Sequence, residues 1–178
     1  LISSNWPQYD LQNFQNTSAD NEIEWVISLI EQIRSIRSEL RVPAGSKIPL
    51  AQIKLDEKFQ DVILKNQILI ERLARLSTIS KGDKLQDGNV TVTVEGGEFS
   101  LQIANFIDLP AERNRLLKAV KKNSDEINML KNKLSNEKFI NNAPGDVINE
   151  ARIRLVELET DLTKLSTALS RLKSKSSL

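Results

Sequence analysis

The chain has 178 residues and a net charge of +1, and it is 39% hydrophobic but only 4% aromatic. It contains no cysteine and no histidine, which excludes disulfides, thiolate metal sites, a thiol nucleophile and a histidine general base. No apolar run approaches the roughly 20 residues that span a bilayer, and no signal-peptide pattern is present, so we expect a cytoplasmic protein without a membrane partner.

Residues 1–44 predict an irregular segment followed by one helix. The chain starts at Leu1 without an initiator methionine, so we expect it to be part of a longer protein. Residues 1–17 predict a loop, with Trp6 and Tyr9 packed against a neighbouring element. Ser18 can cap a helix that ends near Leu40, before a proline. The residues that follow at helical spacing are Ile23, Val26, Ile27, Ile30, Ile33, Ile36, Arg37 and Leu40, and their apolar face needs partners.

Three arginines, Arg34, Arg37 and Arg41, are spaced three and four residues apart along this helix and therefore lie on one face. The spacing leaves two interpretations open. The arginines form either a basic ridge that lies beside an RNA stem, or an ordinary surface ridge that pairs with Glu31 and Glu39.

Residues 45–106 predict a small β-α-β-β unit. Residues 47–55 alternate and contain Pro49, which favours an edge strand or a bulge. A helix capped by Asp56 follows, with an expected inward face of Val62, Ile63, Leu69, Ile70, Leu73 and Leu76. A short strand at 77–80, turns at 81–83 and 86–89, and strands at 89–95 and 99–103 complete the unit, with Gly96-Gly97 as a two-residue hairpin loop.

Residues 107–178 predict two long helices that pair through coiled-coil seams. The second seam alternates spacings of three and four without interruption, and the first is interrupted by polar residues. The first seam comprises Leu116, Val120, Asn123, Ile127, Leu130 and Leu134, and the second comprises Ile148, Ala151, Leu155, Leu158, Leu162, Leu165, Leu169 and Leu172. We expect Asn123 to set the register and Arg113 to face solvent.

A break at residues 141–146 separates the two seams. Pro144 and Gly145 stop a helix, and Asp146 can cap the next one. This predicts an antiparallel hairpin with arms of about 30 residues, roughly 45 Å long. The expected fold class is therefore α+β and mainly α, with domains at 1–44, 45–106 and 107–178.

The hairpin is the basic part of the chain. From Leu109 onward there are 14 Lys and Arg against 9 Asp and Glu, a charge of +5, whereas the preceding residues carry −4. This charge is typical either of a solvated helical surface or of a nucleic-acid interface. The candidate cations are Arg115, Lys118, Lys121, Lys122, Lys131, Lys133, Lys138, Arg152 and Arg154. Near the tip, Phe139 either stacks on a base or, as we favour, packs into the loop's own small core.

Four stretches resemble the C-terminal end of the bacterial valyl-tRNA synthetases. They are Ser-Asn-Trp-Pro at 4–7, Ile-Arg-Ser-Ile-Arg-Ser-Glu-Leu-Arg-Val-Pro at 33–43, Ile-Asp-Leu-Pro-Ala-Glu-Arg at 107–113, and a Leu-x-Asn-x-x-Phe-x-x-x-Ala-Pro pattern at 134–144. The resemblance covers essentially the full chain. It implies the end of a helical anticodon-binding domain, a connecting unit and a C-terminal coiled-coil arm.

The resemblance also implies a function. The family attaches valine to its tRNA with ATP and Mg²⁺, and its coiled coil leans on the outer corner of the tRNA, where the D and T loops meet. Its catalytic signatures, His-x-Gly-His and Lys-Met-Ser-Lys-Ser, do not occur here. We therefore expect no catalytic residue, metal site or cofactor in this chain, and the valine-specific tRNA and the rest of the synthetase as partners.

A rival interpretation is a structural coiled-coil module that joins two protein chains. The break at Pro144-Gly145, midway between two similar seams, favours pairing within one chain, so we expect a monomer. A free-standing enzyme ranks third, because the usual catalytic groups are missing.

Overall fold

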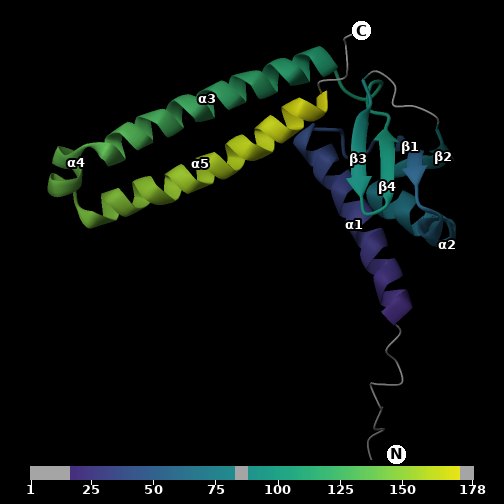
Figure 1. The fold of residues 1–178 in the computed structure, drawn as a ribbon. Coiled ribbons are helices and arrows are strands. Elements are labelled where there is room, and N and C mark those ends of the chain that lie inside the picture. Colours follow the sequence, from purple (N-terminus) through teal and green to yellow (C-terminus); the bar gives the residue numbers. More distant parts are fainter. Residues whose placement is uncertain (1–16, 83–87, 173–178) are drawn as a thin grey trace, which may run out of the picture.

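The computed structural model describes residues 17–82 and 88–172, which form a body and a long arm (Figure 1). The body contains α1 (Thr17–Glu39), α2 (Glu57–Ala74) and a four-stranded sheet. The arm consists of α3 (Leu109–Ser135) and α5 (Gly145–Leu172), joined at the tip by α4 (Glu137–Asn142). The predicted class, α+β and mainly α with a long antiparallel hairpin, is confirmed.

The sheet comprises β1 (Ile48–Leu55), β2 (Leu76–Lys81), β3 (Val90–Val94) and β4 (Gly97–Leu101) in the order β2-β1-β4-β3. The helix α2 is the crossover between the parallel strands β1 and β2, and the other pairs are antiparallel. The prediction of an edge strand around Pro49 is wrong, because β1 is central. The alternative, a bulge, is confirmed by a register shift between Ile48 and Leu50, which accommodates a residue without an N–H group.

The hairpin between β3 and β4 turns one residue earlier than predicted. Val94 pairs with Gly97, so the two loop residues are Glu95 and Gly96 rather than Gly96 and Gly97. Gly96 has φ +62°, and a Cβ there would lie 2.6 Å from Asp56 Oδ2. The loop packs this closely because its Gly96 carbonyl accepts a hydrogen bond of 2.8 Å from the Asp56 N–H group.

The buried face of α1 differs from the prediction at its N-terminal half. Ile23 and Ile27 are 44% and 47% exposed, and Trp25 and Leu29 are buried in their place. The reason is the indole of Trp25, which stacks on Phe59 of α2 with 4.6 Å between ring centroids and so turns this part of the helix. The helix begins at Thr17, so Ser18 lies in its first turn and is not its cap.

The helix α2 is shorter than predicted. It ends at Ala74, Arg75 follows with φ +52°, and Leu76 is the first residue of β2. Leu69 and Leu73, which were expected to face inward, are 42% and 46% exposed because only one stripe of the helix covers the sheet. Asp56 occupies the N-cap position, but its side chain makes no capping hydrogen bond.

Some sequence predictions fall on residues 1–16 and 83–87. Trp6, Tyr9 and parts of both predicted turns lie outside the described residues. The division at residues 44 and 106 stays a prediction. In the structure, α1 shares one hydrophobic core with the sheet, and side chains from the base of the arm, including Leu116 and Ala168, join it.

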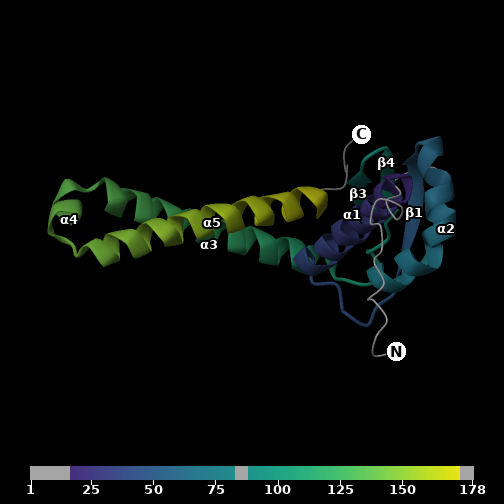
Figure 2. The same cartoon turned by 90° about the horizontal axis from the view of Figure 1, so that it is seen from below.

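The arm pairs the two predicted seams within one chain. Figures 1 and 2 show α3 and α5 side by side along their length. Leu116, Ile127, Ala151 and Leu158 are buried, and the other predicted seam residues are half-buried. Arg113 is exposed, as expected. With 27 and 28 residues, the helices are about 40 Å long rather than 45 Å.

The tip differs from the predicted loop at 141–146. The first arm ends at Ser135, and Asn136 caps α4, with its Oδ1 atom accepting a 3.0 Å hydrogen bond from the Lys138 N–H group. The second break lies at Pro144, whose carbonyl accepts from Val147. Asp146 therefore lies in the first turn of α5 and is not its cap. A short connecting helix replaces part of the expected first arm, which explains the shorter length.

Candidate nucleic-acid interface

The base of the arm is fixed to the end of α1 through Glu39. The Glu39 carboxylate pairs with Arg171 of α5, and its backbone carbonyl accepts a 3.2 Å hydrogen bond from Arg115 Nη2 of α3. At the start of α3, the Asp108 carboxylate caps the helix by accepting from the Ala111 N–H group at 2.9 Å. These contacts set where the arm leaves the body.

Arg115, a predicted RNA contact, belongs to this attachment. Its Nε atom donates to Glu112 Oε2 at 2.8 Å, and its other end reaches the Glu39 carbonyl. The hydrogen bonds that Arg115 donates to the Glu112 carboxylate raise the pKa of Arg115. A guanidinium held on two sides by protein oxygens supports the arm rather than a ligand.

Three lysines on the outer face of α3 are free of such contacts. Lys118, Lys121 and Lys122 are exposed, and none forms an ion pair or a side-chain hydrogen bond within the part of the chain that the structure describes. Their spacing places them on one helix face. They line a shallow hollow of about 470 Å³ together with Asp125, Glu126 and Met129. This face offers three ammonium groups to an anionic ligand.

Two further predicted cations are exposed and make no side-chain ion pair or hydrogen bond within residues 17–82 and 88–172. Lys138 lies on α4 at the tip, and Arg152 lies near the start of α5. Positive charge that is not neutralised internally therefore extends along the arm from its proximal part to its tip.

Two other predicted cations bridge the helices of the arm. Lys131 Nζ lies 2.7 Å from Glu159 Oε1, and Arg154 Nε lies 3.0 Å from Glu126 Oε1. The hydrogen bond and the charge of Glu126 raise the pKa of Arg154. Both cations flank the seam, where oppositely charged residues of paired helices meet. They support helix pairing, and the sequence pattern alone did not separate them from the free lysines.

The aromatic residue at the tip is engaged by a predicted RNA-binding lysine. Lys133 Nζ lies 4.6 Å from the ring centroid of Phe139, in cation–π contact. Phe139 is half-buried, and its carbonyl accepts a 2.9 Å hydrogen bond from the Ala143 N–H group. This arrangement supports a packing role for Phe139 over base stacking.

The predicted ridge of three arginines on α1 does not exist. Arg34 and Arg41 are exposed, but Arg37 is 7% exposed. Its guanidinium donates to the carbonyls of Ser46 at 2.8 Å, Arg75 at 3.2 Å and Pro43 at 3.3 Å. Burial, and then the charge of Arg75, lowers the pKa of Arg37. Arg37 joins α1 to the ends of two loops and is not a surface cation, so neither earlier interpretation of the ridge holds for it.

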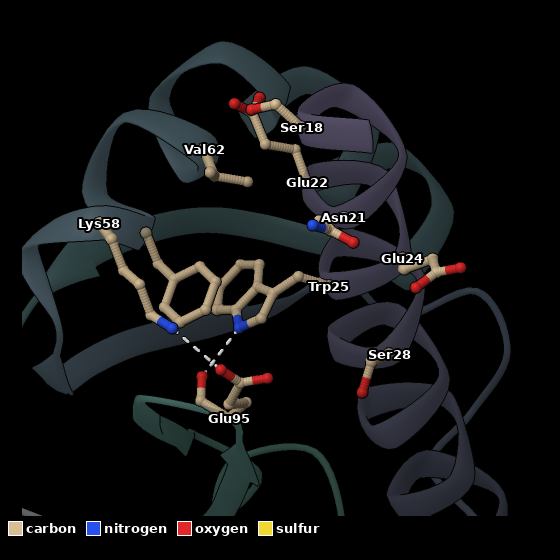
Figure 3. Close-up of a pocket in the computed structure, with 10 residues that line it drawn as sticks. Ser18, Asn21, Glu22, Glu24, Trp25, Ser28, Lys58, Val62 and Glu95 are labelled. Carbon is tan, nitrogen blue, oxygen red and sulfur yellow. Dashed lines mark hydrogen bonds and ion pairs between the residues drawn. The ribbon is translucent and has the colours of Figure 1, made fainter. Parts of the chain in front are cut away.

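A hollow of about 610 Å³ lies in the body, between α1, α2 and the β3–β4 loop. Figure 3 shows that its central polar groups contact one another. Trp25 Nε1 donates to the Glu95 carbonyl at 2.8 Å, and Lys58 Nζ lies 2.9 Å from Glu95 Oε1. These contacts join α1, α2 and the β3–β4 loop.

Among the residues that the structure describes, no group of three or more Asp, Glu, His or Cys side chains is placed to hold a metal ion. No helix in residues 17–82 and 88–172 is long and apolar enough to cross a membrane.

Comparisons with known proteins identify the arm. Residues 108–173 match the family model described as the valyl tRNA synthetase tRNA binding arm. The matched range begins at the cap of α3 and contains the three free lysines.

The whole chain resembles valine–tRNA ligases. It is 41% identical over 172 residues to the enzyme of Cereibacter sphaeroides, 38% over 172 residues to that of Ruegeria pomeroyi, and 37% over 167 residues to that of Bartonella henselae. These matches cover 97%, 97% and 94% of this chain but only 17% to 18% of each relative. Residues 108–173 therefore belong to the family of valyl-tRNA synthetase tRNA-binding arms, and the chain as a whole is similar to a segment of valine–tRNA ligases that includes this arm.

Proposed function

We propose that this chain is the non-catalytic, tRNA-binding portion of a valine–tRNA ligase. Its basic arm holds the outer corner of the tRNA, formed by the D and T loops, while valine is attached elsewhere on the enzyme. The observation that carries the proposal is the row of Lys118, Lys121 and Lys122, which are exposed and have no ion-pair partner among the described residues, on an arm that matches a tRNA-binding family. Folded RNA is commonly bound through its shape and phosphates.

The partners follow from the same proposal. The arm binds a valine-specific tRNA, and the body joins the rest of the ligase, which uses ATP and Mg²⁺ outside this segment. The relatives' name and the small share of their length that the chain covers support this division. We also propose that the protein acts in the cytoplasm.

We further propose that the chain is a monomer. Both seams of the arm are used within one chain, since Leu158 of α5 and Ile127 of α3 are 2% and 5% exposed. An oligomerisation module would need a seam left open for a second chain. Sedimentation tests this directly: a dimer that is lost on replacing Leu158 and Leu162 would overturn the monomer and favour the structural role.

Reversal of the three lysine charges tests the tRNA-binding function. We expect Lys118→Glu/Lys121→Glu/Lys122→Glu to abolish binding of tRNA to the 178-residue chain while the far-ultraviolet circular dichroism stays unchanged. The matched control is Lys54→Glu/Lys65→Glu/Lys81→Glu, which makes the same charge change at exposed positions of the body. If the control variant loses as much tRNA binding as the arm variant, the loss is an effect of net charge alone. Unchanged tRNA binding in the arm variant would refute the proposal.

A further inference from the structure

A second cluster of cations lies on the body, where the C-terminal ends of α1 and α2 meet. We call it the body patch: Arg34, Lys47, Arg72 and Arg75. Two adjoining hollows, of about 440 and 540 Å³, share Arg72, Leu73 and Arg75 in their walls. Arg34 lines the first hollow and Lys47 lines the second. The four residues therefore surround one continuous surface.

The charge of the body patch is not neutralised within the described residues. All four side chains are exposed, and none forms an ion pair or a side-chain hydrogen bond there. Glu71 also lines the second hollow, where its carboxylate accepts a 2.8 Å hydrogen bond from Gln67 and keeps its negative charge, so the four cations outnumber it. The charge of Arg75 contributes to lowering the pKa of the buried Arg37, so like charges are held close together.

Local helix stability explains only part of this cluster. A cation in the last turn of a helix interacts favourably with the helix dipole, which accounts for Arg72. Lys47 lies outside both helices, and Arg34 lies more than one turn before the end of α1. Arg75 adopts φ +52°, a position after a helix that glycine or asparagine fills at a lower conformational cost. An arginine there points to a use for its side chain.

We propose that Arg34, Lys47, Arg72 and Arg75 form a second phosphate-binding surface for the RNA held by the arm. The inference rests on the proposed function and extends it to a second contact region on the same ligand. Guanidinium groups suit phosphate because they donate two parallel hydrogen bonds to it. Clustered cations without carboxylate partners are the electrostatic footprint of such a surface.

The position of the body patch fits a single ligand. Arg34 precedes Glu39, the residue that fixes both helices of the arm, by five positions, or about 7.5 Å along the helix axis. The patch and the base of the arm thus lie at the same end of α1. We therefore expect an RNA that follows the arm toward the body to reach this surface.

The salt dependence of tRNA binding tests the inference. Each phosphate contact contributes about 0.7 to 0.9 to the slope of log K against log salt concentration. We expect Arg72→Gln/Arg75→Gln in the 178-residue chain to lower the magnitude of this slope by about 1.4 to 1.8. Arg72→Lys/Arg75→Lys keeps both charges, so the slope should be retained. The control pair Lys54→Gln/Lys81→Gln, at the other end of β1 and β2, should leave the slope unchanged.

The outcomes separate this inference from the proposed function. An unchanged slope in Arg72→Gln/Arg75→Gln, with binding still lost in the arm lysine variant, overturns the body patch and leaves the function standing. Unchanged binding in the arm variant overturns the function itself. If the patch pair and the control pair lower the magnitude of the slope equally, the body patch is overturned, because such a result reports net charge alone. If Arg72→Gln/Arg75→Gln does not fold, Arg34→Gln/Lys47→Gln takes its place, and we expect the same decrease in the magnitude of the slope.

Discussion

Glu39 and Arg171 form an ion pair that joins the last residue of α1 to the last turn of α5, across 132 positions of sequence. Both side chains are 23% exposed. The same glutamate offers its backbone carbonyl to Arg115 of α3 and its second carboxylate oxygen to Ser35. One residue therefore contacts both helices of the arm and, together with the buried Leu116 and Ala168, joins the arm to the body.

Glu39→Gln should loosen this attachment. The substitution removes the charge but keeps the shape, and it leaves Arg171 half-buried without its carboxylate. We expect a loss of about 1 to 2 kcal/mol, more than exposed ion pairs contribute. Thermal unfolding and amide hydrogen exchange in the last turn of α5 measure it. Glu95→Gln breaks the exposed pair with Lys58 and should cost less than about 0.5 kcal/mol. Equal effects of the two substitutions would contradict the role given to Glu39.

Arg37→Met should destabilise the body strongly. It removes the donor for three backbone carbonyls, those of Ser46, Arg75 and Pro43, while the volume of the side chain is roughly kept. Leaving these part-buried acceptors unpaired costs about 2 to 3 kcal/mol in total. Urea unfolding provides the measurement. The exposed Arg34 on the same helix gives the control, because Arg34→Met should change stability by less than about 0.5 kcal/mol. If Arg37→Met lowered the free energy of unfolding only slightly, these hydrogen bonds would contribute little to stability.

Leu158→Ala should weaken the pairing of the arm helices. Leu158 is 2% exposed at the centre of the seam, and removing its branched end leaves a cavity that costs about 2 to 3 kcal/mol. The helical signal at 222 nm should melt at a lower temperature. Val156, two residues earlier, is 63% exposed, so Val156→Ala should shift stability by less than about 0.5 kcal/mol. Indistinguishable melting curves for the two variants would argue against this seam.

Gly96→Ala should be costly, and Gly145→Ala should not. Gly96 has φ +62°, and a Cβ there would lie 2.6 Å from Asp56 Oδ2 and 2.7 Å from Phe59 Cε2. We expect a loss of about 1 to 3 kcal/mol from the backbone conformation, with the close contacts adding to it. A Cβ at Gly145 meets nothing within 4 Å, and Gly145 begins α5, so alanine there should add about 0.4 to 1 kcal/mol. Chemical denaturation of both variants decides whether the two glycines differ in this way.

The arm could be predicted because its pattern is local and repeated. Seven-residue periodicity fixes which side of each helix is buried, and a break between two equal seams fixes the antiparallel return. The sheet was harder to place, because the position of β1 depends on a parallel crossover to β2 and on a pairing with the distant β4. The hairpin shifted by one residue because the close approach of Phe59 and Asp56 requires glycine at position 96.

The candidate site could be predicted only in part. Exposed lysines on a helix look alike in sequence, and the partners of Lys131 and Arg154 lie on the opposite helix of the arm, 28 residues away. Arg37 did carry a signal, since it falls between Ile33, Ile36 and Leu40 on the apolar face of α1. For the patch residues Arg72 and Arg75 the sequence carried no such signal, because their proximity to Arg34 arises from the packing of α1 against α2.

Attachment at one end makes the arm a lever (Figure 1). With a length of about 40 Å, a tilt of about 10° at the base moves the tip by about 7 Å. A load applied to the tip is in turn transmitted as torque to the final turn of α1, through Glu39 and its two arginine partners. Those polar contacts and the buried side chains at the base of the arm, such as Leu116 and Ala168, therefore resist any force on the tip, and their stiffness determines how precisely the tip is positioned.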